Sequence, residues 1–232
     1  MKYEITDIGL EGTNLHRIRA LVDIPRYGVK KGDLGGYIES ESNLSQEGAC
    51  WVSGYARVSG NARVSGNALV SGYARVSGDA WVYGDAWVSG NAWVSGDARV
   101  SGDARVSGDA RVSGDARVYG NAWVYGNARV FGNARVSGDA WVYGDAWVSG
   151  NAQVSGDALV FGDSWETSPL YIQGSKYALT NCKHGYIKIG CEIHTIDEWL
   201  ANGVEIGRAN GFNDAEIAEY TAYVELFKRV GK

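Results

Sequence analysis

Residues 98–115 read Ala-Arg-Val-Ser-Gly-Asp three times in succession, and this stretch decides the fold. The same six-residue unit runs without a break from Cys50 to Gly162, with Trp replacing Arg, Tyr replacing Ser or Asn replacing Asp at some positions. Valine recurs every six residues from Val52 to Val160, which gives nineteen repeats. A fixed period of this kind indicates a solenoid in which each repeat is one structural unit.

Each repeat predicts a short strand followed by a sharp corner. Ala and Val are two positions apart, so in an extended strand both face one side while the Arg or Trp between them faces the other. The Gly-Asn or Gly-Asp pair that follows is expected to supply backbone conformations with positive φ. A helix is excluded, because glycine every six residues costs about 1 kcal/mol each relative to alanine.

No repeat can bury its valine alone, so the repeats must stack into coils with a continuous Val and Ala core. An aliphatic residue followed four positions later by a small one, as at Val52 and Ala56, resembles the pattern of the hexapeptide-repeat superfamily, which includes LpxA-like acyltransferases. The resemblance implies a mainly β fold, a single-stranded parallel β-solenoid with the left-handed β-helix form. In that superfamily three hexapeptides make one coil of 18 residues. Nineteen repeats would then form about six coils, roughly 30 Å long.

A flatter coil of two hexapeptides, 12 residues long, also satisfies the period. Aromatic residues recur at an interval of 18, as at Tyr55 and Tyr73, which favours three sides. The pair Trp81 and Trp87 recurs at an offset of 60, at Trp141 and Trp147, and 60 is divisible by 12 but not by 18. We interpret this offset as a duplication of repeats with no bearing on the coil.

With an 18-residue coil, the outward residues form three columns. The first column, an apolar and aromatic stripe, contains Trp51, Leu69, Trp87, Arg105, Trp123, Trp141 and Leu159. The second contains Arg57, Arg75, Trp93, Arg111, Arg129 and Trp147. The third contains Arg63, Trp81, Arg99, Arg117, Arg135 and Gln153.

The stripe of Trp51, Leu69, Trp87, Trp123, Trp141 and Leu159 predicts an interaction surface. Contiguous apolar patches usually mark interfaces, and tryptophan is enriched among interface hot spots. The partner is expected to be another protein or further copies of this chain, as a dimer or trimer. The alternative is that outward Trp and Arg stack on one another and only support the wall.

The arginine faces are secondary candidates, since guanidinium groups suit phosphate. The arginines concerned are Arg57, Arg75, Arg111, Arg129, Arg99, Arg117 and Arg135. Aspartates at the corners are similar in number, and we expect the two sets to neutralise one another. With a net charge of −5, neither nucleic acid nor a membrane is an expected partner. Calcium at the corners is not favoured either, because the aspartate spacing matches no known calcium repeat.

The two ends predict caps. Residues 1–49 are expected to form a β-rich N-terminal cap, residues 50–165 the β-solenoid, and residues 166–232 a small α/β domain. Strands are expected at Tyr3–Ile8, His16–Ile24 and Gly36–Glu39 in the first of these parts. In the last they are expected at Leu170–Ile172, Tyr177–Asn181 and Tyr186–Ile193. Capping boxes at Thr195 and Asn213 predict two C-terminal helices, the first ending near Gly211.

Both flanks of the solenoid carry a second resemblance. Residues 35–51, with Gly-Gly-Tyr-Ile-Glu at the start, and residues 186–199 resemble the corresponding parts of hexapeptide-repeat proteins encoded by phages and prophages. That group implies no settled activity. It suggests an accessory protein that blocks a host factor, such as a component of antiviral defence, by steric occlusion in the bacterial cytoplasm.

Catalysis of the acyltransferase type is the enzyme alternative, and a structural or polymer-forming element is a third. Acyltransferases of the resembled superfamily use a histidine base, often with a loop that interrupts a coil. Here the solenoid has no histidine and no inserted loop, and the three histidines are His16, His184 and His194. We therefore expect no catalytic residue and no cofactor.

The cysteines are sparse, which indicates a reducing cytoplasm and no disulfide framework. Two of the three lie near histidines, as Cys182 with His184 and Cys191 with His194. Two Cys and two His with short spacers form a candidate zinc site, and Cys191 with His194 a candidate nucleophile pair. We favour simple core packing over both.

Overall fold

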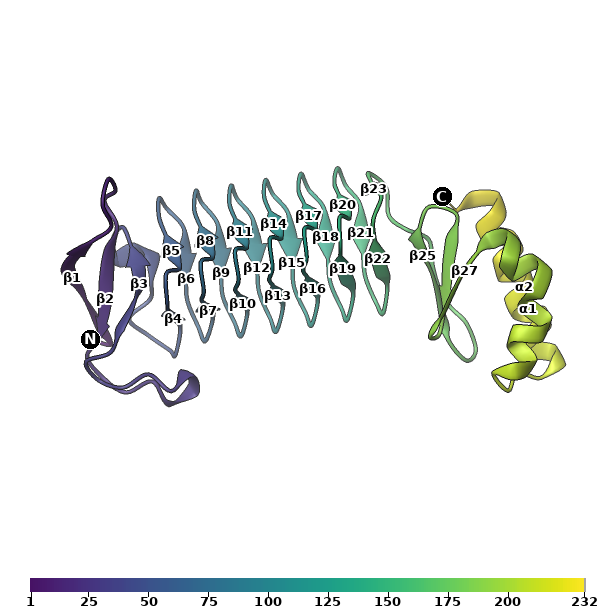
Figure 1. Ribbon diagram of the computed structural model, residues 1–232, viewed down its shortest axis with the longest axis horizontal. Helices are drawn as coiled ribbons and strands as arrows, with labels where there is room; N and C mark the ends of the chain where they lie inside the picture. Colours follow the sequence, from purple (N-terminus) through teal and green to yellow (C-terminus); the bar gives the residue numbers. More distant parts are fainter. Residues whose placement is uncertain (232) are drawn as a thin grey trace.

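The repeats form parallel coils stacked along one axis in the computed structural model, which describes residues 1–231 (Figure 1). Each strand pairs in parallel with the strand 18 residues away, as Trp87 does with Leu69 on one side and Arg105 on the other. The 18-residue coil is confirmed, and the flat coil of 12 residues is excluded. Because Trp81 and Trp141 lie on different faces, their offset of 60 does not set the coil.

Three strands per coil build three faces. The first face contains β4 (Trp51–Val52), β7 (Leu69–Val70), β10 (Trp87–Val88), β13 (Arg105–Val106), β16 (Trp123–Val124), β19 (Trp141–Tyr143) and β22 (Leu159–Phe161). The second contains β3 (Leu34–Ile38), β5 (Arg57–Val58), β8 (Arg75–Val76), β11 (Trp93–Val94), β14 (Arg111–Val112), β17 (Arg129–Val130), β20 (Trp147–Val148) and β23 (Ser164–Trp165). The third contains β6 (Arg63–Val64), β9 (Trp81–Val82), β12 (Arg99–Val100), β15 (Arg117–Val118), β18 (Arg135–Val136) and β21 (Gln153–Val154).

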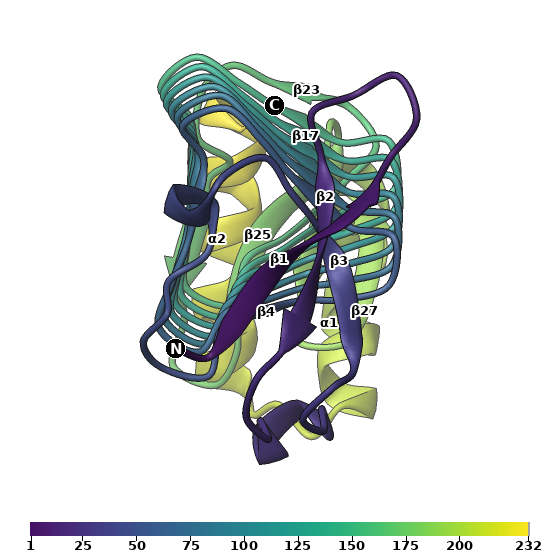
Figure 2. The ribbon, with the colours of Figure 1, turned by 90° about the vertical axis from the view of Figure 1, so that its left-hand side faces the viewer.

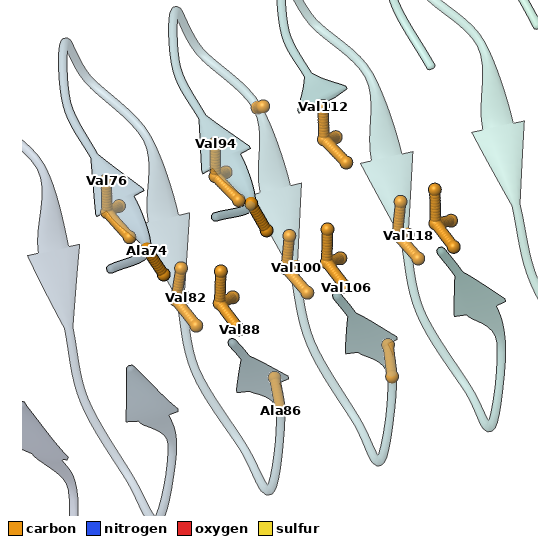
Figure 3. Packing of buried hydrophobic residues seen from close by; sticks show 14 of the residues in the cluster. Ala74, Val76, Val82, Ala86, Val88, Val94, Val100, Val106, Val112 and Val118 are labelled. Carbon is orange, nitrogen blue, oxygen red and sulfur yellow. The ribbon is translucent and has the colours of Figure 1, made fainter. Parts of the chain in front are cut away.

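The interior consists of the repeated Val and Ala side chains, which are fully buried along the coils. Figure 3 shows Val76, Val82 and Val88 pointing inward from successive faces of one coil, with Val94 beside Val76 in the next coil. This confirms the inward placement of Ala and Val in each repeat. Stacking one valine on the next buries each completely, although a single coil is too thin to bury its own core.

Glycine alone supplies the positive φ at the corners. Gly108 has φ 69°, and among residues 1–231 no residue other than glycine has a positive φ. The expectation that Asn or Asp shares this role is wrong. The residue after the glycine instead donates its backbone N–H to the glycine carbonyl of the next coil, as Asp109 does to Gly126 at 2.9 Å.

The N-terminal end is closed by an antiparallel extension of the second face. β1 (Tyr3–Gly9) pairs with β2 (His16–Ala20), which pairs with β3, and these strands lie across the end of the coils (Figure 2). Short 3-10 helices follow at Pro25–Tyr27 and Glu41–Asn43. The Gln46 amide covers the outer edge of β1 by accepting from the Tyr3 N–H and donating to the Tyr3 carbonyl.

Parallel stacking begins before the first regular repeat. Tyr37 of β3 is in register with Arg57, and Leu44 forms a parallel bridge with Val64. This irregular coil adds to the nineteen repeats, so the solenoid has about seven turns, roughly 34 Å from β3 to β23 at the usual strand spacing.

The C-terminal end carries a four-stranded antiparallel sheet followed by two helices (Figure 1). The sheet contains, in order, β24 (Tyr171–Gln173), β25 (Ala178–Lys183), β26 (Tyr186–Ile189) and β27 (Glu192–Thr195). Helix α1 (Ile196–Ala209) and helix α2 (Asp214–Val230) begin at capping boxes on Thr195 and Asn213, as predicted. Within the described part of the chain, neither helix is long and apolar enough to cross a bilayer.

Candidate interaction surface

The strand register places the outward residues in the three predicted columns. On the first face Trp87 lies beside Arg105, Arg105 beside Trp123, and Trp123 beside Trp141. The other faces follow the same rule, as Arg111 with Arg129 and Arg99 with Arg117 show. Because neighbouring strands are about 4.8 Å apart, each outward side chain contacts its equivalents in the coils above and below.

Trp51 does not belong to the exposed surface, although the sequence placed it in the stripe. Its side chain is 1% exposed and packs in the solenoid core. The N-terminal cap covers it: a Cβ at Gly35 would lie 2.7 Å from the Trp51 ring and 2.5 Å from Ile18. Leu69 is half-buried beside it. Of the predicted stripe, Trp87 and Trp141 are exposed, whereas Trp123 and Leu159 are half-buried like Leu69.

From Trp87 onward the stripe is a continuous stack of rings and one guanidinium group. The Arg105 guanidinium lies 5.8 Å from the Trp87 ring centroid and 4.8 Å from that of Trp123. Trp123 then stacks on Trp141 at 5.1 Å with an angle of 4° between the ring planes. Arg105 thus bridges two tryptophans by cation–π contacts instead of interrupting the stripe.

A second aromatic column runs beside the stripe at the adjoining corner. Tyr125 stacks on Tyr143 at 5.2 Å, and Tyr143 on Phe161 at 5.4 Å. Tyr125 also meets Trp141 edge to face at 6.2 Å, so the two columns form one surface. Burial raises the pKa of Tyr125 and Tyr143 above the ordinary value of 10.0, so both phenols are harder to ionise in alkali. The sequence signal was the replacement of the usual Ser by an aromatic residue at this position of the repeat.

Hydrogen bonds to the preceding coil orient several tryptophans. The Trp87 indole N–H donates to the Ser71 hydroxyl at 3.0 Å. Trp81 and Trp93 donate to Ser65 and Ser77 in the same way. These rings are ordered before any partner binds, which lowers the entropy lost on association.

Some arginines of the second face lie over tryptophan rings. Arg111 lies over Trp93 at 5.8 Å and Arg129 over Trp147 at 4.7 Å. Among the described residues no arginine of the repeats forms an ion pair with a corner aspartate. The two sets are therefore nearly equal in number but do not form ion pairs with each other in the described part of the chain. The corner carboxylates accept hydrogen bonds from asparagines one coil away, as Asp109 does from Asn91 at 3.0 Å.

The four side chains of the candidate zinc site do not converge. Cys182 is buried in β25, while Cys191 is exposed at the turn between β26 and β27. His184 lies at the opposite end of β26 from Cys191, so the strand, roughly 13 Å long, separates them. No group of three or more metal-ligating side chains occurs within residues 1–231. The zinc candidate of Cys182, His184, Cys191 and His194 is therefore wrong.

The histidines lie outside the regular coils. His16 is in β2 at the N-terminal end, and its separation from the other two spans the whole solenoid. His184 packs edge to face on Trp165, and His194 on Trp199. His194 also lies 3.3 Å from the Glu192 carboxylate. Both C-terminal histidines are thus engaged by aromatic neighbours.

Comparison with known proteins supports the solenoid. No curated protein matches the chain. A family model described as YdcK Beta solenoid repeat matches ten overlapping segments that together cover residues 56–90, 92–150 and 152–167. These repeats are therefore similar to the YdcK β-solenoid repeat, and with their parallel coils they fit a hexapeptide-repeat-like superfamily.

Proposed function

We propose that this chain is a non-catalytic binding and assembly protein whose partner docks on the aromatic surface of the first face. The observation that carries the proposal is the continuous stack from Trp87 through Arg105 and Trp123 to Trp141, flanked by Tyr125, Tyr143 and Phe161. From Trp87 to Leu159 the surface spans four coil spacings, roughly 19 Å. That length suits the core of a protein interface better than a small-molecule site.

Exposure favours an interface over simple support of the wall. Trp87 and Trp141 remain 42% and 41% exposed although each already contacts its neighbours. Large exposed rings on a rigid, flat scaffold are the residues that contribute most to binding energy when a partner covers them. A partner would bury the remaining area with little loss of side-chain freedom.

The charge of the solenoid favours a protein partner over nucleic acid. Residues 50–165 contain nine arginines and ten aspartates, and no lysine or glutamate. A solenoid this close to neutral lacks the excess of positive charge that phosphate backbones need. The partner is another protein or a second copy of the chain, and either one is held mainly by apolar contact.

In its concrete form the proposal is steric occlusion of a host factor. The flanking segments resemble phage and prophage proteins, and a rigid rod with capped ends needs no catalytic residue to cover a functional surface. We propose the bacterial cytoplasm as its location, since Cys50, Cys182 and Cys191 are all free thiols. The target would be a component of antiviral defence.

The test uses two variants with the same loss of tryptophan on different faces. Trp123→Ser with Trp141→Ser removes the stack of the first face, whereas Trp81→Ser with Trp93→Ser removes exposed rings from the third and second faces. Purified tagged chains are incubated with bacterial lysate and bound proteins are quantified by mass spectrometry. Each candidate is then purified and its affinity measured by calorimetry.

The expected result is a purified partner that binds the wild type and the control variant but binds the first-face variant at least about tenfold more weakly. Sedimentation velocity on the same three proteins tests whether the partner is the chain itself. Equal binding by both variants would reject this surface as the interface. Binding of acyl-coenzyme A that disappears with His184→Ala or His194→Ala would instead support the enzyme alternative.

A further inference from the structure

The C-terminal domain contains a cavity of about 590 Å³ that plays no part in the aromatic surface of the solenoid. It lies between helices α1 and α2 and the turn that joins β26 to β27. The core of this domain consists of only seven buried side chains, among them Trp199, Tyr220 and Val224, which also line the cavity. Cavities between about 300 and 1,000 Å³ are typical of small-molecule sites.

The walls are aromatic and aliphatic. Phe212 meets Tyr220 edge to face at 5.0 Å and lies 5.8 Å from Tyr177. Ile206 and Ile217 complete the apolar lining. These walls offer water few hydrogen-bond partners, so an apolar ligand that displaces water from them gains affinity.

Four polar side chains along the cavity donate hydrogen bonds to backbone carbonyls of the chain. The bonds are from Trp199 Nε1 to the Ile187 carbonyl, Tyr220 OH to the Tyr177 carbonyl, Thr221 Oγ1 to the Ile217 carbonyl, and Asn210 Nδ2 to the Ile206 carbonyl, at 2.7–3.0 Å. The Glu192 carboxylate faces His194 at 3.3 Å. A ligand would therefore be recognised by its apolar surface and not by its charge.

Lys188 also borders the cavity, but its ammonium group belongs to the other face of the sheet. It alternates along β26 with Ile187 and Ile189, which are buried against the helices. Burial raises the pKa of the Cys182 thiol, and the Lys188 charge acts against that rise; Cys182 in turn acts on Tyr143 of the solenoid. No free cation is thus directed into the cavity from this strand.

Two glycines lie on the α1 wall of the cavity. Gly203 and Gly207 are one turn apart and both line it. A Cβ at Gly203 would meet no atom closer than the Trp199 ring at 3.9 Å. A Cβ at Gly207 would instead lie 3.2 Å from the Ile217 side chain, so Gly207 allows α2 to pack closely on α1. Glycine weakens a helix interior relative to alanine, so Gly203 acts against helix stability while leaving space for a ligand.

We infer that this cavity binds an uncharged, mainly apolar small molecule that carries an aromatic ring. Its volume sets the size of the ligand, the rings of Trp199, Phe212 and Tyr220 match an aromatic group, and the satisfied polar groups exclude a charged one. The inference is independent of the proposed docking on the solenoid.

The probe is N-phenyl-1-naphthylamine, an uncharged compound with a naphthyl and a phenyl group whose fluorescence rises in apolar sites. Titration of the full chain is expected to show saturable binding with one site per chain. Gly203→Leu projects a side chain into the cavity and is expected to weaken binding at least about tenfold, while raising the helix propensity of α1. Gly203→Ala is the matched control, and its affinity is expected to stay within about twofold of the wild type.

Two further binding measurements complete the test. The sulfonated analogue 1-anilinonaphthalene-8-sulfonate is expected to bind at least about tenfold more weakly, because its charge would be buried without a partner. The Trp123→Ser and Trp141→Ser variant is expected to bind the neutral probe as the wild type does. Absence of saturable binding, equal binding by Gly203→Leu, equal affinity for the sulfonate, or loss of binding in the tryptophan variant would each overturn the inference.

Discussion

The indole ring of Trp123 lies flat on that of Trp141, with ring centroids 5.1 Å apart and an angle of 4° between the planes. The two residues are 18 positions apart and occupy neighbouring strands of the first face. Their contact exists only because the coil closes after three hexapeptides. The same contact stabilises the wall and presents two ordered rings to solvent, so its energetic contribution and its role in binding must be measured separately.

The stacking predicts a coupling between the two tryptophans in stability. Trp123→Ser and Trp141→Ser are each expected to lower the free energy of unfolding, and the double variant by less than the sum. The coupling energy should be about 0.5–1.5 kcal/mol, as for other aromatic pairs. Urea denaturation of the four proteins in the cycle measures it. Trp81→Ser with Trp147→Ser, on separate faces, is the control and should be additive within about 0.5 kcal/mol.

Replacing Arg105 is predicted to change the stability of the chain differently from replacing an arginine of the third face. Its guanidinium lies between the Trp87 and Trp123 rings, so Arg105→Met should destabilise the chain by about 0.5–2 kcal/mol. Arg117 instead lies between Arg99 and Arg135, and like charges directly opposite destabilise a sheet. Arg117→Met should therefore be neutral or stabilising.

Thermal denaturation at low and high salt checks both arginine variants. Salt screens repulsion between exposed charges, so it should stabilise the wild type more than Arg117→Met. Equal effects of the two substitutions at every salt concentration would show that Arg105 gains nothing from its aromatic neighbours.

The six-residue period is sufficient to predict the solenoid, because every Val and Ala has the same environment. The residue between them is assigned to a face by counting alone, and the three columns are confirmed. The burial of Trp51 was not predictable in this way, since it depends on Gly35 and Ile18, which come from the cap and follow no period. The first coil escaped prediction for the same reason: the parallel partners Tyr37 and Leu44 stand in a segment without the repeat pattern.

The candidate sites at the C-terminal end depended on side-chain directions that spacing does not determine. Cys182 and Cys191 are close in sequence, but β26 lies between them and only Cys191 is exposed. The cavity beside α1 gives no local signal either, because its lining comes from several separate segments between Tyr177 and Val224. Only the two glycines of α1, unusual inside a helix, mark it in the sequence.

The two C-terminal cysteines are predicted to react at very different rates. Cys191 is exposed, whereas burial raises the pKa of the Cys182 thiol to about 11. Iodoacetamide at neutral pH should therefore modify Cys191 in the native protein and leave Cys182 and the buried Cys50 unmodified until urea is added. Peptide mass spectrometry assigns the modified residue. Rapid native labelling of Cys182 would contradict its placement in β25.

The raised pKa of Cys182 also predicts a loss of stability in alkali. An acid whose pKa is higher in the folded than in the unfolded chain contributes its full stability below the unfolded value, near 9.0, and loses it as the pH rises toward about 11. Burial raises the pKa of Tyr3 as well, so the decline should continue beyond that range. Cys182→Ala should flatten the part between pH 9 and 11 in urea denaturation curves. An unchanged slope would show that the thiol is not the titrating group.

Gly12 and Gly108 have the same backbone conformation but different surroundings. Replacing each by alanine therefore distinguishes the free-energy cost of a positive φ from the cost of a clash between coils. Gly12 has φ 71° and a Cβ there would meet nothing within 4 Å, whereas Gly108 has φ 69° and its Cβ would lie 3.0 Å from backbone atoms of Gly126. Gly12→Ala should therefore cost only the left-handed backbone term, about 1 kcal/mol. Gly108→Ala adds a clash with backbone that stacking cannot relieve, for a total of roughly 2–4 kcal/mol. Urea denaturation compares the two, and equal losses would mean that the coils can move apart locally.

Because a solenoid transmits stability only between neighbouring coils, the effect of Gly108→Ala should also be local. Hydrogen exchange should show lowered protection of the strands next to that corner, while protection of the C-terminal sheet should not change.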